Sequence, residues 1–208
     1  ARRNMSKKLR ANLKMGWIYW HPFIYNSLLF LLYNGRPHDR FKEIAKEICD
    51  GDHVIDLCAG NDFLFKTLAK RSINYTAYDI NLRFINSLKN KGINAHKIDI
   101  SKENIPKGDV IVLASALYHF YPNCQKLIDR MLEKAEKKVI IVEPIRNVVN
   151  STNRIMAFVA ERAGRINNCK TDYRFDEDSL RSLLDNVKVP TKTSVICDGR
   201  DLCAVFYK

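Results

Sequence analysis

The stretch Val54-Ile55-Asp56-Leu57-Cys58-Ala59-Gly60-Asn61-Asp62 decides the fold of this chain. It begins with apolar residues, reaches an acid, and passes through small residues to one glycine before the apolar pattern of residues 63–68. That order predicts a buried strand, a tight turn and the start of a helix. At the carboxyl end of a strand in an open α/β sheet, such a turn borders a ligand crevice, because small residues admit a ligand to the backbone and the helix start offers free N–H groups.

Two further predicted strands also end in an acid. Residues 75–79 end at Asp79, which lies 23 positions after Asp56, and residues 93–99 end at Asp99, another 20 positions on. An acid after the second strand can accept hydrogen bonds from both hydroxyls of a ribose, and an acid after the third can accept one from an adenine amino group. The three strand ends together therefore favour a site for an adenine nucleoside.

On these residues the chain resembles the class I S-adenosylmethionine-dependent methyltransferases. Residues 56–60 lie where the first motif of that family lies, Asp79 where its ribose-binding acid lies, and Asp99 where its adenine-binding acid lies. Residues 114–119 are similar to the fourth motif. The resemblance covers residues 40–208 and departs at the first motif, where Cys58 and Asp62 replace two expected glycines.

The resemblance implies S-adenosyl-L-methionine as the cofactor and S-adenosyl-L-homocysteine as its product. It places at the cofactor residues from the first motif, the two downstream acids with their neighbours, and the fourth motif: Asp56, Cys58, Ala59, Gly60, Asn61, Asp79, Ile80, Asp99, Ile100, Ala114 and Ser115.

Several acids in and beside these motifs also have a structural interpretation. Asp56 either orients the loop or reaches the methionine ammonium through a water, and Asp99 could be a solvated turn acid. Asp62 is interpreted as the N-cap of the following helix. Glu143 ends the fifth strand, and the sequence does not decide whether it faces substrate or packing.

Two residues just past the fourth strand are the candidates for catalysis. His119 lies where the transferred methyl group is expected and could act as a general base near neutral pH, since an imidazole titrates there. Tyr118 lines the same mouth. Lone histidines are more often structural, so both interpretations stay open.

The pattern along the chain alternates between apolar strands and amphipathic helices, which predicts a buried parallel sheet. The fold class is α/β: a seven-stranded, mostly parallel sheet with an antiparallel C-terminal hairpin strand, helices on both faces and an N-terminal helical lid. The hairpin is predicted from two β-rich runs around the Asp198-Gly199 turn. Strands are expected from residue 54 and at 74–79, 93–98, 109–113, 139–143, 187–197 and 202–207, and helices at 38–49, 62–71, 81–91, 123–136, 147–168 and 175–186.

Composition limits the class of protein. The 208 residues fit one α/β domain with an appendage, and 46% hydrophobic with 28% charged residues is ordinary for a globular chain. The six cysteines form no CxxC pair and no cluster with zinc spacing. We therefore expect free thiols in a reducing cytoplasm, no structural disulfide and no metal.

The N-terminal segment, residues 1–37, is expected to be a basic and aromatic arm, ahead of a methyltransferase domain at 38–208. Residues 1–40 hold eight basic side chains and one acid, so they carry +7 of the net charge of +12. The apolar run at 17–33 is interrupted by polar residues and Pro22, and it is shorter than the roughly 20 residues of a spanning helix. It is interpreted as a lid over the site, with Tyr19, Tyr25 and Tyr33 as candidate contacts. A compatible interpretation places it peripherally on an anionic membrane surface.

Four functions are compatible with parts of this pattern. A methyltransferase acting on N or O of a small-molecule or lipid-like acceptor is favoured by the aromatic arm. An RNA methyltransferase, for example of ribose, is favoured by the charge, but nucleic acid is the less favoured partner because the motif typical of base amino methylation is missing. A nicotinamide-dependent oxidoreductase is disfavoured, because the chain lacks the G-x-G-x-x-G motif of that class. A non-catalytic binding module of methyltransferase-like fold stays open because of the altered loop. The oligomeric state is not predicted.

Overall fold

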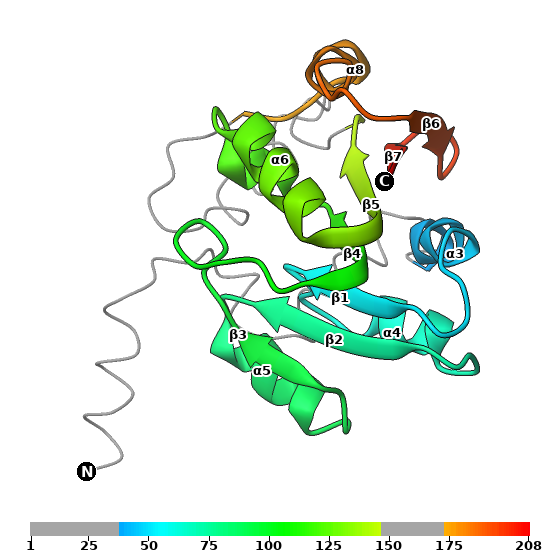
Figure 1. The fold of residues 1–208 in the computed structure, drawn as a ribbon, viewed down its shortest axis with the longest axis vertical. Coiled ribbons are helices and arrows are strands. Elements are labelled where there is room, and N and C mark those ends of the chain that lie inside the picture. Colours follow the sequence, from blue (N-terminus) through cyan, green and yellow to red (C-terminus); the bar gives the residue numbers. More distant parts are fainter. Residues whose placement is uncertain (1–37, 147–172) are drawn as a thin grey trace, which may run out of the picture.

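The computed structural model describes residues 38–146 and 173–208 (Figure 1). The predicted arm and lid at 1–37 and the predicted helix at 147–168 lie outside these residues. The described part folds around one twisted sheet, as the alternating sequence pattern predicts.

The sheet has seven strands in the order β3-β2-β1-β4-β5-β7-β6. Strands β1 to β5 are parallel to one another, and β7 is antiparallel to both β5 and β6. The predicted mostly parallel sheet with a reversed last strand is therefore confirmed. The bounds are β1 His53–Leu57, β2 Asn74–Asp79, β3 Ala95–Lys97, β4 Gly108–Ala114, β5 Ala135–Pro144, β6 Thr191–Ile196 and β7 Asp201–Tyr207.

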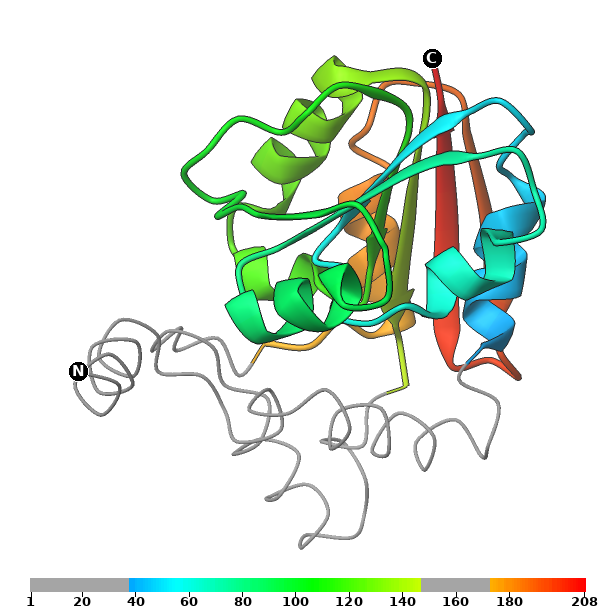
Figure 2. The same cartoon turned by 90° about the horizontal axis from the view of Figure 1, so that it is seen from below.

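Helices cover both faces of the sheet, as predicted (Figures 1 and 2). One face is packed by α3 (Asp39–Lys46), α4 (Phe63–Leu68) and α5 (Leu82–Lys89), and the other by α6 (Cys124–Lys134) and α8 (Glu177–Leu184). The helices α3 and α4 also pack against each other, with the rings of Phe41 and Phe63 5.8 Å apart. A 3₁₀ turn, η2 (Leu117–Phe120), follows β4.

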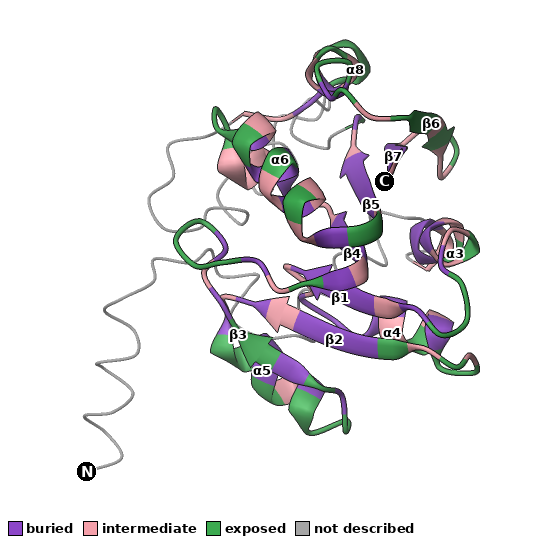
Figure 3. Ribbon diagram, viewed as in Figure 1, coloured by how far each residue is buried: buried purple, intermediate pink, exposed green. Residues whose placement is uncertain are grey.

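The two hydrophobic cores follow from the two-residue period of a strand. On β4, Val110 and Val112 join the core under α3, α4 and α5, whereas Ile111 and Leu113 join the core under α6 and α8. All four side chains are fully buried, and burial is concentrated along the strands and the sheet-facing sides of the helices (Figure 3). Continuous Val/Ile runs are thus explained by packing on both sides.

Some predicted boundaries were wrong by a few residues. The helix expected to continue to residue 136 ends at Lys134, and β5 begins at Ala135, because Ala135 is already paired with Gly108 of β4. Gly108 has no room for a side chain: a Cβ there would lie 2.5 Å from Cγ1 of Ile55 on the neighbouring strand. The predicted strand at 187–197 is shorter, and it begins after Pro190, which has no N–H for a ladder.

The C-terminal part of the chain also forms as its sequence indicates. Asp176 caps α8 by accepting a hydrogen bond from the backbone N–H of Ser179, whose hydroxyl accepts one from the backbone N–H of Asp176. The hairpin between β6 and β7 turns through Asp198 and Gly199, both with positive φ. Within the described residues, Cys49, Cys58, Cys124, Cys197 and Cys203 are free thiols.

Candidate cofactor-binding site

The carboxyl ends of the parallel strands β1, β2 and β4 lie on the same side of the sheet. From β1 the chain adds β2 and β3 on one side and then β4 on the other, so the strand order reverses between β1 and β4. A reversal of strand order of this kind leaves a crevice at the carboxyl ends, where ligands of open α/β sheets bind. We refer to this side of the sheet as the carboxyl edge. The predicted cofactor residues of the first motif, Asp79 and the fourth motif lie along it.

The loop after β1 is built from backbone conformations that side chains rarely adopt. Cys58 has φ +55° and Gly60 φ +60°, which are left-handed values that glycine tolerates without strain and cysteine does not. The backbone N–H of Ala59 donates to the carbonyl of Tyr78 on β2 (3.1 Å). The loop is therefore fastened to the neighbouring strand end and keeps its small residues at the edge.

Asn61, rather than Asp62, satisfies the start of α4. The side-chain oxygen of Asn61 accepts a hydrogen bond from the N–H of Phe63 (3.0 Å). Asp62 occupies the N-cap position, as predicted, but its carboxylate makes no capping bond and pairs instead with Lys66 (3.0 Å) and Lys91 (2.9 Å). The predicted capping role of the Asp62 side chain was wrong, because two lysines compete for that carboxylate.

Asp79 joins the end of β2 to the glycine of the loop. Its carboxylate accepts hydrogen bonds from the backbone N–H of Gly60 (3.0 Å) and of Asn81 (2.7 Å), and the residue is buried. Burial raises the pKa of Asp79 to about 6, although these hydrogen bonds act in the opposite direction. A carboxylate offers about four lone-pair sites, so Asp79 retains acceptor capacity for a ligand. Ile80, the next residue, is half-buried.

Asp56 is held by a residue that the sequence analysis did not single out. The hydroxyl of Tyr75 on β2 donates to its carboxylate at 2.6 Å. Asp56 is almost fully buried, and this desolvation raises its pKa to about 7, with the nearby charge of Asp79 acting in the same direction. Tyr75 lies opposite Val54 in the register, two positions along β2 from Ala77, the partner of Asp56, so it shares a face of the sheet with that acid.

Asp99 follows β3 and lies in a separate turn. It is half-buried, and its carboxylate accepts hydrogen bonds from the backbone N–H (3.1 Å) and hydroxyl (2.5 Å) of Ser101. Burial would raise the pKa of Asp99, but these bonds and Lys102 outweigh it and lower the pKa. Ile100 is buried in the core beneath the turn.

The fourth motif ends in a buried polar cluster. Ser115 has φ +56°, and its hydroxyl accepts a hydrogen bond from the guanidinium of Arg40 on α3. Arg40 also holds Asp201 of β7 through both carboxylate oxygens, each 2.9 Å from Nη2. Nearby, Glu143 accepts from the N–H of Leu117 (2.9 Å), and its burial raises its pKa to about 8. Ala114, the last residue of β4, is half-buried.

The predicted catalytic residues lie in η2, beside an aromatic group. The rings of Tyr118 and His119 are 3.9 Å apart, and the guanidinium of Arg174 lies 4.0 Å from the centroid of Tyr118. Desolvation first, and then the charge of Arg174, lower the pKa of His119 to about 3, so the imidazole is neutral at physiological pH. Tyr121 and Tyr173 stack nearby at 3.8 Å.

Comparisons with known proteins agree with this geometry. The model of the family described as methionine biosynthesis protein MetW matches residues 38–157. The chain belongs to the MetW family. No curated protein matches it.

Several of the solved structures similar to this MetW-family chain are methyltransferases. One is an S-adenosylmethionine-dependent methyltransferase from Archaeoglobus fulgidus, with TM-score 0.61, 13% identity, and coverage of 88% of this chain and 100% of that one. Another is the magnesium protoporphyrin IX methyltransferase of Synechocystis, solved with S-adenosylhomocysteine, with TM-score 0.60, 13% identity, and coverage of 85% and 84%.

A third is an O-methyltransferase family 2 protein from Planctomyces limnophilus in complex with apigenin, with TM-score 0.61, 16% identity and coverage of 88% of this chain. The MetW-family chain spans 61% of the length of that protein. At these identities the likeness establishes a shared class I methyltransferase fold.

The structure brings some of the predicted site residues of this MetW-family chain into contact and adds others to their surroundings. Gly60 and Asp79 touch, and Tyr118 and His119 touch, whereas Tyr19, Tyr25 and Tyr33 lie outside the described residues. Sequence reasoning missed Arg40, Tyr75 and Asp201. An arginine on the otherwise apolar face of a predicted helix was the signal for Arg40.

Among residues 38–146 and 173–208, no three His, Cys, Asp or Glu side chains gather in a way that could hold a metal ion. Over the same ranges, no helix has both the length and the apolar character to span a bilayer.

Proposed function

We propose that this chain is an S-adenosylmethionine-dependent methyltransferase that transfers a methyl group to N or O of a small-molecule or lipid-like acceptor. The observation that carries the proposal is the contact between Asp79 and Gly60. It makes the acid after β2 and the glycine loop after β1 one unit at the carboxyl edge. That pairing suits a nucleoside whose ribose is bound by the acid while its remainder passes close to the loop backbone.

Bound S-adenosylmethionine would supply an activated methyl group on a sulfonium. Asp79 would then accept from the ribose hydroxyls, and Asp99 from the adenine amino group. Gly60 and Ala59 would let the cofactor approach the backbone, and Cys58, Asn61, Ala114 and Ser115 would border it. Such chemistry needs in-line positioning more than covalent help.

His119 and Tyr118 are the proposed catalytic pair at the acceptor end. A pKa near 3 keeps His119 neutral, so its imidazole can exchange hydrogen bonds with an acceptor hydroxyl or amine without charge repulsion. It also makes His119 a weak base, which favours orientation of the acceptor over full removal of its proton. The stacked Tyr121 and Tyr173 rings beside this pair support an acceptor with an apolar or planar part.

Calorimetric titration of S-adenosylhomocysteine tests the cofactor. We expect micromolar binding by the unaltered protein and a loss of at least tenfold, about 1.4 kcal/mol, on Asp79→Ala and Asp79→Asn. Asp109→Asn is the matched control, because Asp109 lies at the opposite edge of the sheet. No binding by a folded, unaltered protein would contradict the proposal.

Acceptor screens test the second half of the proposal. Because the family is described by methionine biosynthesis, small amino-acid derivatives belong in the screen with aromatic compounds and anionic phospholipids. Cosedimentation with anionic vesicles, lost on deleting residues 1–37, would support a peripheral membrane site. Cofactor binding without turnover on any acceptor would instead indicate a binding module.

A further inference from the structure

A single arginine connects α6 to the turn that follows β3. The guanidinium of Arg130 donates from Nη1 to the carbonyl of Ile100 (2.6 Å) and from Nη2 to the carbonyl of Glu103 (2.5 Å). These carbonyls belong to residues 99–103, which we call the adenine turn because Asp99 begins it. The mechanism proposed above assigns no role to Arg130.

The adenine turn is closed on itself but weakly held by the sheet. The carbonyl of Asp99 accepts from the N–H groups of Lys102 (2.9 Å) and Glu103 (2.8 Å). The strand before it, β3, has three residues and lies at the edge of the sheet, paired with β2 alone. A short edge strand fixes the direction of the following turn poorly, since few ladder hydrogen bonds hold it.

The helix that carries Arg130 is, by contrast, rigidly seated. Leu127, Ile128 and Met131 of α6 are buried in the core beneath the sheet. A guanidinium is planar and presents its donors in a fixed fork, so two carbonyls held by one fork cannot rotate independently. Arg130 therefore ties the adenine turn to α6, in addition to the burial of Ile100 in the core.

We propose that Arg130 is a positioning residue for the adenine end of the cofactor site. By fastening the adenine turn to α6, it directs the Asp99 carboxylate toward the adenine amino group. This inference rests on the proposed function. Asp99 has capacity for the contact, because Ser101 occupies only Oδ1, and the Lys102 pair on Oδ2 involves a largely exposed side chain.

Arg71 provides a matched control. Its guanidinium also donates to two backbone carbonyls, those of Ala45 (2.9 Å) and Ile48 (2.7 Å), but it ties the segment after α4 to the end of α3, away from Asp99. Arg71→Met therefore removes a similar brace, together with an exposed ion pair to Asp50 (2.7 Å), without touching the adenine turn.

The test compares S-adenosylhomocysteine with S-inosylhomocysteine, in which an oxo group replaces the adenine amino group. A carboxylate that accepts from the amino group should reject the oxo analogue. We expect the unaltered protein to prefer S-adenosylhomocysteine by at least tenfold. Arg130→Met should weaken its binding by about tenfold and reduce that preference, Arg130→Lys should restore part of both, and Arg71→Met should leave both unchanged.

The outcomes separate the two proposals. A folded Arg130→Met protein with unchanged affinity and preference, or with equal loss for both ligands, overturns the role of Arg130 while the cofactor assignment stands. If the unaltered, folded protein binds neither ligand, the proposed function and this inference both fall. If Arg130→Met does not fold, Arg130→Lys carries the comparison, and an unchanged preference in that protein counts against the proposal.

Discussion

Acidic side chains at the carboxyl edge have different surroundings from Asp109 at the opposite side of the sheet, where the parallel strands begin, which we call the amino edge. At the carboxyl edge, Asp56, Asp79 and Glu143 are buried, and desolvation raises their pKa values to about 7, 6 and 8. At the amino edge, Asp109 accepts from the N–H of His53 and pairs with Lys137, and both contacts lower its pKa. Burial of these three acids at the carboxyl edge thus disfavours their charged form, although each accepts at least one hydrogen bond.

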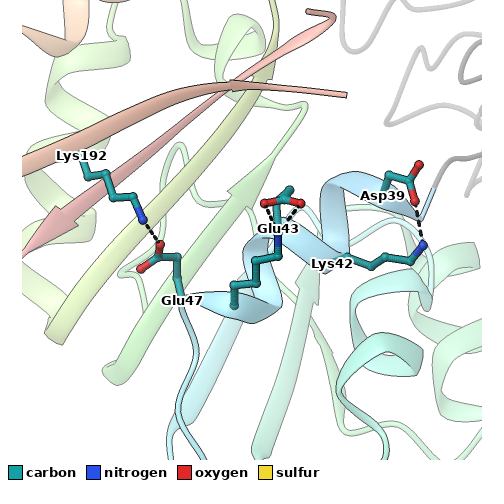
Figure 4. A network of polar contacts seen from close by, with 6 residues as sticks. Asp39, Lys42, Glu43, Glu47 and Lys192 are labelled. Atoms are coloured by element: carbon teal, nitrogen blue, oxygen red, sulfur yellow. Dashed lines mark hydrogen bonds and ion pairs between the residues drawn. The ribbon is translucent and has the colours of Figure 1, made fainter. Parts of the chain in front are cut away.

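The helix α3 runs between these two edges and shows both kinds of surroundings. Near the start of α3, the Arg40 side chain is buried and pairs with Asp201. The exposed side of α3 carries the pairs Asp39–Lys42 and Glu43–Lys46 (Figure 4). Glu47, just past the end of α3, pairs with Lys192 of β6. This difference agrees with the proposed function, in which a ligand at the carboxyl edge supplies further donors. The amino edge is organised for stability in water.

The largest expected effect is on the buried pair. Removing one partner leaves an uncompensated buried charge, so Arg40→Met should lower the free energy of unfolding by about 3–5 kcal/mol. Urea denaturation measures this, with Lys42→Met on the same helix as the control, expected to cost less than about 1 kcal/mol. Replacing both partners, in Arg40→Met with Asp201→Leu, should recover much of the loss. A similar loss of unfolding free energy in Arg40→Met and in Lys42→Met would contradict the difference between the buried and exposed sides of α3.

The second effect concerns the pH dependence of stability at the carboxyl edge. The pKa of Asp56 in the folded protein lies above that of the unfolded chain, so the folded state retains a proton that the unfolded chain has lost. Asp56 therefore lowers the free energy of unfolding as pH rises from about 4 to 7. Asp56→Asn keeps an acceptor for Tyr75 and cannot ionise. The unfolding free energy of Asp56→Asn minus that of the unaltered protein should increase by roughly 2–4 kcal/mol from pH 4 to pH 8.

The matched variant at the amino edge should show the opposite sign. The folded pKa of Asp109 is lowered, so its stabilisation is present above the unfolded pKa and is lost as pH falls through the folded value. Asp109→Asn should cost about 1 kcal/mol at pH 7, and little at pH 2–3. Parallel pH series of urea denaturation on the two variants give the comparison. Curves of the same sign would refute the distinction between the edges.

The smallest effect is expected on the exposed side of α3. Lys46 and Glu43 pair at 2.7 Å, but the lysine side chain is largely exposed. Lys46→Met should change the free energy of unfolding by less than about 0.5 kcal/mol, and less still in high salt. Thermal unfolding at two salt concentrations checks this. A cost above 1 kcal/mol would show that the surface pairs act as a network.

Much of the fold could be predicted because it depends on local patterns. The continuous apolar runs at 109–113 and 139–143 predict strands buried on both faces, and they form the central strands β4 and β5. Asp198-Gly199 predicts a turn, and both residues adopt positive φ in the hairpin. The end of α6 and the start of β5 were mispredicted because pairing between Ala135 and Gly108 overrides helix propensity there. Local preference at Ala135 carries no information about a partner 27 positions earlier.

The sequence by itself determined the succession of strands and helices along the chain, the glycine loop, and the acids near the ends of β1 and β2. Each of these follows from residue spacing and apolar period along the chain. Only the tertiary structure decided which of these groups meet. It joined Asp79 to Gly60, Tyr75 to Asp56, Arg40 to Asp201 and Ser115, and Arg130 to the adenine turn. The physical reason is that a buried polar group must find a partner in three dimensions. That partner is set by strand order and helix packing, not by distance along the chain.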